Sequence, residues 1–369
     1  MIPVNEPLLN GNEKSYLAEC IDTGWISSEG PFVHRLENEF AGRTGRRHGV
    51  AVCNGSAALD LAVAALRLRP GDEVILPSFT IISCAACILR AGAVPVLVDS
   101  DPLTWNMCVE QVAEKITAHT SAIIVVHIYG LPVDLQPLLK IAQKHGLKII
   151  EDASEMHGAN YRSRPCGSFG ELSTFSFYPN KHVTTGEGGM VLTNDDALAE
   201  RCRSLRNLCF SPPRRFVHQE LGWNMRMSNL QAAVGVAQLE KLDEFVERKR
   251  RNGRLYNRKL AGVPGIRAQP ERMEFAENIY WVYGVVLDDD VPFDAGEAMQ
   301  RLAELGVETR PFFWPMHEQP VLRKMNLFEG ESYPVAERLA RRGFYLPSGM
   351  ALTENQIDIV VAAMRKILQ

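Results

Sequence analysis

The feature that most constrains this chain is a regular alternation of short apolar segments with amphipathic segments, which begins near residue 49. The apolar segments are continuous runs rich in Val and Ile, as is typical of strands whose sheet is covered on both faces. The segments between them show the apolar spacing of helices and end at turn signals such as "RPGD". The alternation predicts an α/β fold with a mostly parallel central sheet flanked by helices. The predicted strands are 49–53, 73–77, 95–99, 121–130 and 147–154.

The pattern changes in the second half of the chain. Residues 228–260 read as one long helix, and residues 279–287, "IYWVYGVVL", read as a strand. The remainder has the mixed order of helices and strands that is typical of a smaller α+β domain. We therefore expect a large sheet domain followed by a smaller C-terminal α+β domain.

Composition excludes several classes of function. The chain has 369 residues, is 46% hydrophobic and carries a formal net charge of -4, which gives no basis for nucleic-acid binding. No apolar run reaches the ~18 residues of a membrane span, and the N-terminus lacks the layout of a signal peptide. We expect a cytoplasmic protein that binds neither nucleic acid nor membranes.

The cysteines and histidines give no sign of a metal site. Cys84 and Cys87 form a CxxC pair, but it lies in the apolar, helix-like segment "IISCAACILRAG" and has no second pair to complete a zinc site. The nine histidines include no HExxH motif. We expect reduced, buried cysteines and no bound metal.

Polar residues that follow predicted strands are the candidates for a binding site, because ligands of open α/β sheets bind beyond the C-terminal strand ends. Gly55 and Ser56 stand where a helix begins, which suits a phosphate, although capping of that helix by Asn54 or Ser56 explains them equally well. Asp152 ends a buried strand and could be a turn cap, and Lys181 alone could be a surface lysine.

Together these residues match the chemical needs of pyridoxal phosphate. That cofactor requires an anchor for its phosphate, an amine for its aldehyde and a carboxylate for its ring nitrogen. Lys181 follows Asp152 by 29 residues in the stretch "TFSFYPNKHVTTGEGGMVLTND", whose glycines would let the backbone pass close behind the lysine. A dinucleotide enzyme is the main alternative, since "PVLVD" ends in Asp99. No GxGxxG or GxxxxGK[ST] motif supports it.

The sequence resembles the sugar aminotransferases of the fold-type I pyridoxal phosphate superfamily, and among them the GDP-perosamine synthase group. The resemblance covers nearly the whole chain and is carried most specifically by "STFSFYPNKHVTTGEGGMV" and "LGWNMRMSNLQAAVGVAQLE", with support from "CNGSAALDLA", "IIEDASEMHGA" and "VETRPFFWPMH". It implies an N-terminal segment (1–30) that contributes to the active site, a large cofactor-binding domain (31–245) and a small C-terminal domain (246–369). It also implies a homodimer with shared active sites.

The resemblance assigns roles to residues of the cofactor site. It makes Lys181 the Schiff-base lysine and Asp152 the partner of the pyridine nitrogen. It places Gly55, Ser56 and Ser176 on the phosphate, Glu155 near the 3-hydroxyl, and Asn224 on the phosphate of the neighbouring subunit's cofactor. Relatives usually have an aromatic residue at the position of Ile81, so here the ring would lie on Ile81 itself or on Phe79.

The resemblance also implies a substrate and a reaction. The enzyme would pass an amino group from L-glutamate, through pyridoxamine phosphate, to GDP-4-keto-6-deoxymannose, giving GDP-perosamine for a polysaccharide such as the O-antigen of lipopolysaccharide. The substrate-binding candidates are Trp25, His127, Tyr129, Arg310 and His317. Arg214 and Arg215 in "SPPRRF" could supply cations for a diphosphate, or they could equally be two solvated surface arginines.

Three residues expected near the cofactor depart from the perosamine-synthase pattern: Met156 and His157 in "IIEDASEMHGA", and His182 next to Lys181. They keep open an aminotransferase for another keto or aldehyde sugar, such as an 8-oxo octulosonate. A dehydratase that uses pyridoxamine phosphate is a weaker alternative, because such enzymes have histidine in place of the lysine. A sensor or structural relative without activity would be expected to lose Lys181 or Asp152, and both are present.

Overall fold

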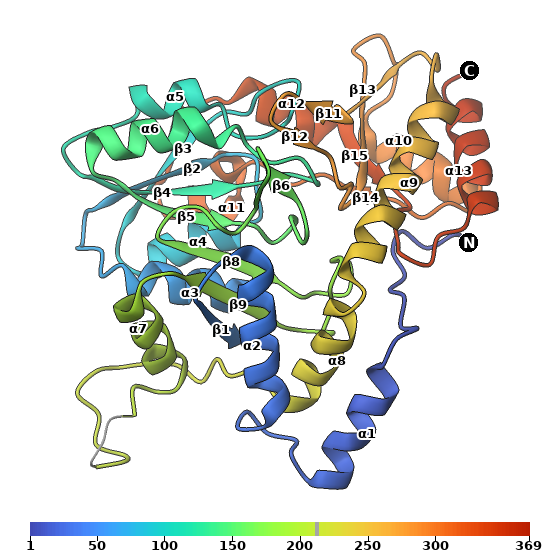
Figure 1. Ribbon diagram of the computed structural model, residues 1–369. Coiled ribbons are helices and arrows are strands. Elements are labelled where there is room, and N and C mark those ends of the chain that lie inside the picture. Colours follow the sequence, from blue (N-terminus) through green and yellow to red (C-terminus); the bar gives the residue numbers. More distant parts are fainter. Residues whose placement is uncertain (211–213) are drawn as a thin grey trace.

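The computed structural model describes residues 1–210 and 214–369, and its centre is a seven-stranded sheet (Figure 1). The strand order is β1-β9-β8-β5-β4-β2-β3. Neighbouring strands from β8 to β3 are parallel, and β9 alone runs against its neighbours β8 and β1. The predicted mostly parallel sheet is therefore confirmed. The strands are β1 (His48–Val52), β2 (Glu73–Pro77), β3 (Val94–Val98), β4 (Thr120–Val126), β5 (Lys148–Asp152), β8 (Leu172–Ser176) and β9 (Gly189–Thr193).

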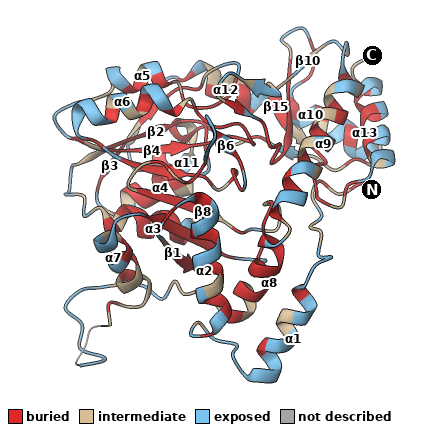
Figure 2. Cartoon of the chain, viewed as in Figure 1, coloured by how far each residue is buried: buried red, intermediate tan, exposed pale blue. Residues whose placement is uncertain are grey.

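Both faces of this sheet are buried, which explains why its strands read as continuous apolar runs. In β4, Ile123 and Val125 point into one hydrophobic cluster, whereas Ile124 and Val126 point into another, as the two-residue period of a strand requires. Figure 2 shows the strands as buried and the outer faces of the covering helices as exposed. Among the helices that contribute to these two clusters are α2 (Pro31–Thr44), α3 (Gly55–Ala65), α4 (Ser83–Arg90), α5 (Val109–Glu114), α6 (Leu135–His145), α7 (Asp196–Arg206) and α8 (Asn229–Leu239).

The C-terminal part forms a smaller α+β unit around a third hydrophobic cluster, as predicted (Figure 1). Its antiparallel sheet has the order β10-β13-β15-β14. The strands are β10 (Ile266–Ala268), β13 (Tyr283–Leu287), β14 (Arg310–Pro311) and β15 (Gly343–Leu346), and the helices α10 (Ala295–Glu304) and α13 (Glu354–Ile367) contribute to the third cluster. The helices α11 (Pro320–Arg323) and α12 (Pro334–Arg342) instead place Leu322, Ala336 and Leu339 in the second cluster, on the large sheet. Short elements complete the described chain: β6 (Asn160–Tyr161), β7 (Arg164–Pro165), β11 (Arg272–Met273), β12 (Ala276–Glu277) and the 3-10 turn η1 (Met316–Glu318).

Two predictions about the second half of the chain were wrong in detail. The single helix predicted over 228–260 is two helices, α8 and α9 (Leu242–Leu260), separated at Glu240 and Lys241. The break allows α8 to pack on α2 while α9 continues to α13 of the small unit. The strand predicted from residue 279 begins only at Tyr283, because Ile279 donates its N–H to Gly130 and Tyr280 has a φ of 50°.

The N-terminal residues connect the two parts of the molecule. Ile2 pairs with Val307 of the small unit, and α1 (Glu13–Thr23) packs on α8 at the opposite end of Figure 1. The domain boundary predicted at 245/246 falls inside α9. Among the described residues, no helix has the length and apolar character needed to cross a membrane.

Candidate active site

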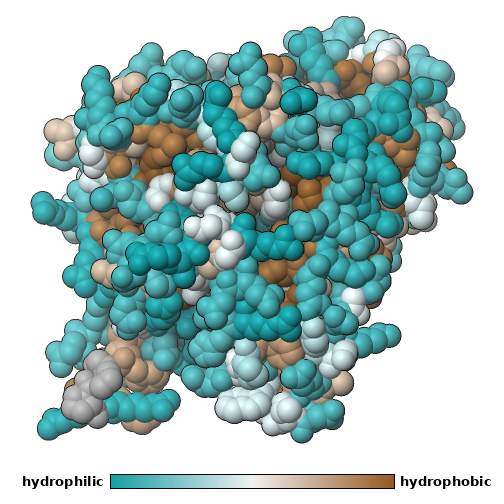
Figure 3. Space-filling view, viewed as in Figure 1, coloured by the Kyte–Doolittle hydropathy of each residue, from teal (hydrophilic) through white to brown (hydrophobic). Residues whose placement is uncertain are grey.

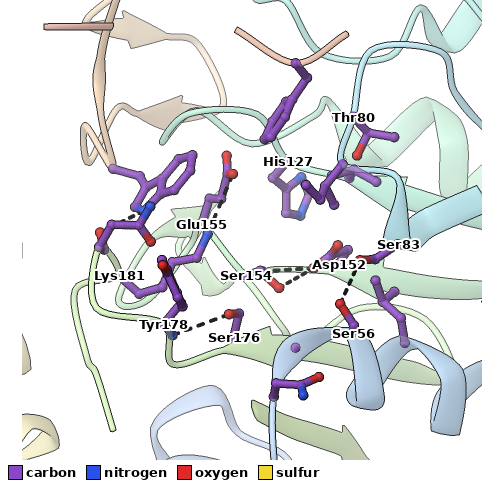
Figure 4. Close-up of a pocket in the computed structure, with 18 of the residues that line it drawn as sticks. Ser56, Thr80, Ser83, His127, Asp152, Ser154, Glu155, Ser176, Tyr178 and Lys181 are labelled. Carbon is purple, nitrogen blue, oxygen red and sulfur yellow. Dashed lines mark hydrogen bonds and ion pairs between the residues drawn. The ribbon is translucent and has the colours of Figure 1, made fainter. Parts of the chain in front are cut away.

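A cavity of about 540 Å³ lies beyond the C-terminal ends of β4, β5 and β8, where the topology of the sheet predicts a ligand site. Its walls come from the start of α3, the ends of these strands and the loop that contains Lys181 (Figure 4). Residues from the second half of the chain close the remaining side. Seven of the predicted site residues line the cavity: Gly55, Ser56, His127, Asp152, Glu155, Ser176 and Lys181.

The start of α3 is built to leave N–H groups available in this cavity. Asn54 caps the helix by accepting a hydrogen bond from the N–H of Ala57 at 2.8 Å. Gly55 and Ser56 precede Ala57, and their N–H groups belong to the first turn, which a helix cannot satisfy by itself. A Cβ atom on Gly55 would lie 2.6 Å from the Cβ of Ser176, so only glycine lets this turn approach the end of β8. Helix capping and phosphate binding are therefore compatible at this turn. Asn54 supplies the cap, and Gly55 and Ser56 line the cavity where an anion could bind.

Asp152 is the last residue of β5 and is only 3% exposed. One of its carboxylate oxygens accepts several hydrogen bonds. Its Oδ1 accepts hydrogen bonds from the N–H of Ser154 at 3.1 Å, the Ser154 hydroxyl at 2.5 Å and the Thr174 hydroxyl at 3.3 Å. Its Oδ2 lies 3.6 Å from the Cys84 thiol. Burial and the Asp152 charge raise the pKa of that thiol well above its ordinary value. The predicted buried, reduced state of Cys84 and Cys87 agrees with their burial as free cysteines.

The loop between β8 and β9 holds Lys181 at the cavity wall. Phe177 and Thr185 are joined across the base of the loop by a backbone hydrogen bond of 3.0 Å. Gly186 adopts a φ of 78°, and a Cβ atom on Gly189 would lie 2.5 Å from the carbonyl oxygen of Asn54. The glycines of "TTGEGG" thus provide a left-handed turn and a close backbone approach, as the sequence predicted.

The Lys181 amine lies between an acidic and an aromatic side chain. Its Nζ is 3.7 Å from Glu155 Oε1 and 3.7 Å from the centre of the Trp281 ring. Figure 4 shows the Lys181 and Glu155 side chains pointing toward each other. Burial lowers the pKa of the Lys181 amine, while the charges of Glu155 and Asp152 oppose that shift. The amine is therefore easier to deprotonate than a surface lysine, as a group that moves protons requires.

Glu155 is held by the backbone of the turn that follows β4. Its Oε2 accepts a hydrogen bond of 2.6 Å from the N–H of Tyr129, a residue with a φ of 61°. Burial raises the pKa of the Glu155 carboxyl to about 8, against the opposing effect of the Lys181 charge. Glu155 and Lys181 thus form a buried pair that can share or exchange a proton.

Of the two residues predicted to lie against the cofactor ring, Ile81 and Phe79, only Ile81 lines the cavity. Ile81 lines the cavity and is 43% exposed, so its aliphatic side chain faces the space where a ring would lie. Phe79 is fully buried and packs against Tyr129, Phe312 and Phe313 instead.

Two predicted substrate residues lie in the protein interior rather than on the cavity wall. Tyr129 is 1% exposed, and its hydroxyl accepts a hydrogen bond from the N–H of Phe313 at 3.2 Å. His317 is 2% exposed and connects Ser78 to Glu337, at 2.9 Å and 3.1 Å. In this chain both residues hold the segment that follows β14 against the large sheet. His127, which does line the cavity, accepts the N–H of Val133 on Nδ1, so its Nε2–H donates to Glu151 at 3.0 Å.

The other predicted site residues are exposed and lie away from the cavity. They are Trp25 just after α1, Asn224 and Arg310. Asn224 pairs with Asn207 at the end of α7, and Arg310 is in the edge strand β14. Arg214 and Arg215 are also exposed, and Arg215 lies over the rings of Phe210 and Phe216. The preceding residues of that motif, 211–213, lie outside the described residues.

Sequence reasoning missed the aromatic wall of the cavity. Trp281, Phe313 and Tyr345 come from the second half of the chain and close the side that faces Lys181. Phe313 lies in the motif "VETRPFFWPMH", but the sequence did not indicate that its ring lines the cavity. The segment "IYWVYG", which contains Trp281, was predicted only as part of a strand. Four further lining residues had no sequence signal of their own: Thr80 between β2 and α4, Ser83 at the start of α4, and the loop residues Ser154 and Tyr178.

The chemistry of these side chains fits pyridoxal phosphate. The cavity wall includes a helix N-terminus with Ser56, and Ser176 beside it, which suits a phosphate. It also includes the buried Asp152 carboxylate and the Lys181 amine. The donor set therefore contains an anion site, a carboxylate and an amine in one cavity, as this cofactor needs.

Comparison with known proteins identifies the family. The model of the DegT/DnrJ/EryC1/StrS aminotransferase family matches residues 7–365. The chain is 42% identical to the GDP-perosamine synthase of Caulobacter vibrioides, over 100% of this chain and 98% of that protein. It is 40% identical to the GDP-perosamine synthase of Vibrio cholerae, over 97% of this chain and 96% of that protein.

The fold agrees with solved structures of the same class. The aminotransferase TlmJ from Streptoalloteichus hindustanus superimposes with a TM-score of 0.92 at 32% identity, covering 100% of this chain and 99% of that structure. The match extends over the large sheet and the small α+β unit alike. The chain belongs to the DegT/DnrJ/EryC1/StrS aminotransferase family and is a pyridoxal-phosphate-dependent sugar aminotransferase.

Proposed function

We propose that Lys181 bonds to the aldehyde of the cofactor and moves the proton during transfer, and that Asp152 holds the ring nitrogen protonated. The observation that carries this proposal is the placement of the buried Lys181 amine and the Asp152 carboxylate in one cavity at the start of α3. When bound, pyridoxal phosphate supplies an aldehyde that receives the amino group and a ring that withdraws electrons from the reacting carbon.

The residues of the chain divide the remaining work. Ser56, Ser176 and the first N–H groups of α3 are proposed to hold the phosphate, because they share the end of the cavity where the helix dipole is positive. The lowered pKa of the Lys181 amine would allow it to accept a proton from the reacting carbon and to donate it again later in the transfer. Glu155 is proposed to lie beside the 3-hydroxyl of the ring, where its buried carboxyl can pair with Lys181 when the amine is free. The walls of the cavity, including Ile81 and Tyr345, would exclude water from the reacting atoms.

We propose GDP-4-keto-6-deoxymannose as the acceptor, with amination at C4 to give GDP-perosamine and L-glutamate as donor. Support comes from three GDP-perosamine synthases, each 39% to 42% identical to this chain over 97% or more of its length. The related sugar dehydratases would need histidine in place of Lys181, and this chain has lysine there and His182 beside it.

An acceptor panel tests this choice. The protein would first be converted to its pyridoxamine phosphate form with L-glutamate, and each acceptor would then be added while the return of the visible absorption band is followed. We expect rapid return with GDP-4-keto-6-deoxymannose and slow return with a UDP-linked keto-sugar. Rapid return with an 8-oxo octulosonate and none with the GDP-sugar would contradict the substrate and leave the aminotransferase assignment intact.

We also propose that two chains assemble into a dimer with shared active sites. Asn224 is exposed and outside the cavity of its own chain, so it is free to reach a cavity in a partner. The segment that contains it projects from the same end of the molecule as α1 (Figure 1). Exposed apolar side chains occur on α1 and just after it (Ile21 and Trp25) and in the segment of Asn224 (Leu221 and Trp223). The surface seen in Figure 3 is otherwise mostly hydrophilic.

A further inference from the structure

Trp281 is held rigidly beside the lysine loop by contacts on two sides. Its indole Nε1–H donates to the carbonyl oxygen of Asn180, the residue before Lys181, at 2.9 Å. Its own carbonyl oxygen accepts a hydrogen bond of 2.8 Å from the buried amine of Lys249 on α9. With only 4% of its surface exposed, the indole ring has one fixed orientation relative to the loop.

The Lys181 Nζ lies over this ring, 3.7 Å from its centre. The face of an indole ring carries the negative part of its quadrupole and attracts an ammonium group, most strongly where water is excluded. The same amine is also 3.7 Å from Glu155 Oε1. Two groups that favour a cation thus converge on one amine, and both are positioned by backbone hydrogen bonds of their own.

We propose that the indole face of Trp281 and the Glu155 carboxylate form a holding site for the Lys181 amine, occupied whenever that amine is not bonded to the cofactor. The proposal rests on the assignment of Lys181 as the cofactor-bonding lysine. Transamination frees the lysine once per half-reaction, and a long, flexible side chain would otherwise sample many positions. A holding site keeps the amine at the cavity wall, so that it remains available for the proton transfer. Trp281 is in this sense a positioning residue.

The other charged groups around Lys181 limit how strongly the site can hold it. Glu155 and Asp152 favour the ammonium form. Lys249 is a further buried cation, and its pKa is lowered mainly by burial and further by the charge of Lys181. His157 and His182 are buried nearby, and burial lowers the pKa of both, so they remain neutral and add no competing charge. Burial still lowers the pKa of Lys181, despite these carboxylates. The holding site therefore keeps the amine in place and still allows it to lose its proton.

The test measures the Lys181 amine directly in the full chain freed of cofactor. Reductive methylation with formaldehyde and borohydride modifies only the neutral amine, and mass spectrometry of the Lys181 peptide at a series of pH values gives its pKa. We expect this pKa to fall in the order wild type, Trp281→Phe, Trp281→Leu, with a total change of about one unit, or about tenfold faster labelling at low pH. Trp314→Leu is the control, because that tryptophan lies over Arg341 and does not line the cavity; its Lys181 profile should match the wild type.

Two outcomes would overturn the proposal. One is a folded Trp281→Leu protein, with cooperative thermal unfolding, whose Lys181 pKa is unchanged or raised. If Trp281→Leu does not fold, an unchanged profile in Trp281→Phe overturns it equally, because phenylalanine fills most of the space but attracts a cation less strongly. Reduction of the cofactor-loaded wild type with borohydride is a separate measurement. A pyridoxyl group on another lysine would contradict the role of Lys181 itself, whatever the labelling profile of the Trp281 variants.

Discussion

Glu151 and Asp152 are consecutive carboxylates at the end of β5 that serve two different sites, because successive side chains of a strand point in opposite directions. Glu151 accepts the N–H groups of Gly167 at 2.6 Å and Phe169 at 2.9 Å, and pairs with His127. Asp152 instead faces the cavity with Lys181. One carboxylate therefore holds the fold and the other is available for chemistry.

Replacing Glu151 with leucine should destabilise the protein without removing a group from the cavity. The substitution leaves two buried N–H groups and the His127 ring without their acceptor, so we expect a loss of about 3–5 kcal/mol in the free energy of unfolding. Denaturant titration measures this loss. Lys148→Ala is the control on the same strand, because its ion pair with Glu171 is solvent-exposed and should contribute less than about 1 kcal/mol. A Glu151→Leu protein as stable as Lys148→Ala would contradict the assignment.

Replacing Asp152 with asparagine should affect catalysis far more than folding. The amide keeps the shape and can still accept the Ser154 hydrogen bonds, but it cannot stabilise a protonated ring nitrogen. We expect the rate of the half-reaction with L-glutamate to fall by about 10²–10³-fold, while cofactor still attaches to Lys181. Stopped-flow absorbance gives the rate, and intact-protein mass after borohydride reduction gives the attachment. A rate within a few fold of wild type would show that Asp152 has no such role.

The buried Lys249 makes stability depend on pH in a predictable direction. Burial lowers its pKa from 10.5 to about 7. Between these values the unfolded chain binds a proton that the folded chain does not, so the stability that this lysine contributes rises with pH and is lost as pH falls toward 7. The difference in free energy of unfolding between wild type and Lys249→Met should therefore shift in favour of the wild type as pH rises through this window. A difference that stays constant across the window would contradict the lowered pKa.

Asn224 provides a test of the shared active site. A chain with Asn224→Ala and a chain with Lys181→Ala should each be inactive or strongly impaired, yet a mixture should regain activity. In a mixed dimer one site combines the intact Lys181 of one chain with the intact Asn224 of its partner, so up to half of the sites in that dimer are restored. Refolding or co-expression of the two variants with different tags isolates the mixed species. Activity of the mixture no greater than the sum of its parts would contradict the arrangement.

The elements of the large sheet could be predicted from sequence because their signals are local. The Val and Ile runs of β4 and β5 require burial on both faces, and Asn54 marks the start of α3 by the hydrogen bond that it can make. The lysine loop was equally visible, since its glycines are needed for a positive φ at Gly186 and a close contact at Gly189.

Features that depend on distant packing could not be predicted in this way. Trp281 is 100 residues beyond Lys181, and nothing local indicates that its ring covers that amine. Tyr129 was predicted on the substrate from a motif, whereas the fold buries it among aromatic rings. The break between α8 and α9 follows from the different partners of the two helices, not from a proline or glycine at Glu240 or Lys241.

The central claim, that Lys181 is the residue that bonds to pyridoxal phosphate in the cavity at the end of the sheet, is tested most directly by locating the attached cofactor. The loaded protein would be reduced with borohydride, digested and analysed by mass spectrometry. We predict one pyridoxyl group per chain, on the peptide that contains Lys181, and none in a Lys181→Ala protein that keeps the wild-type circular dichroism spectrum. A pyridoxyl group on a different lysine, or equal attachment in Lys181→Ala, would contradict the account.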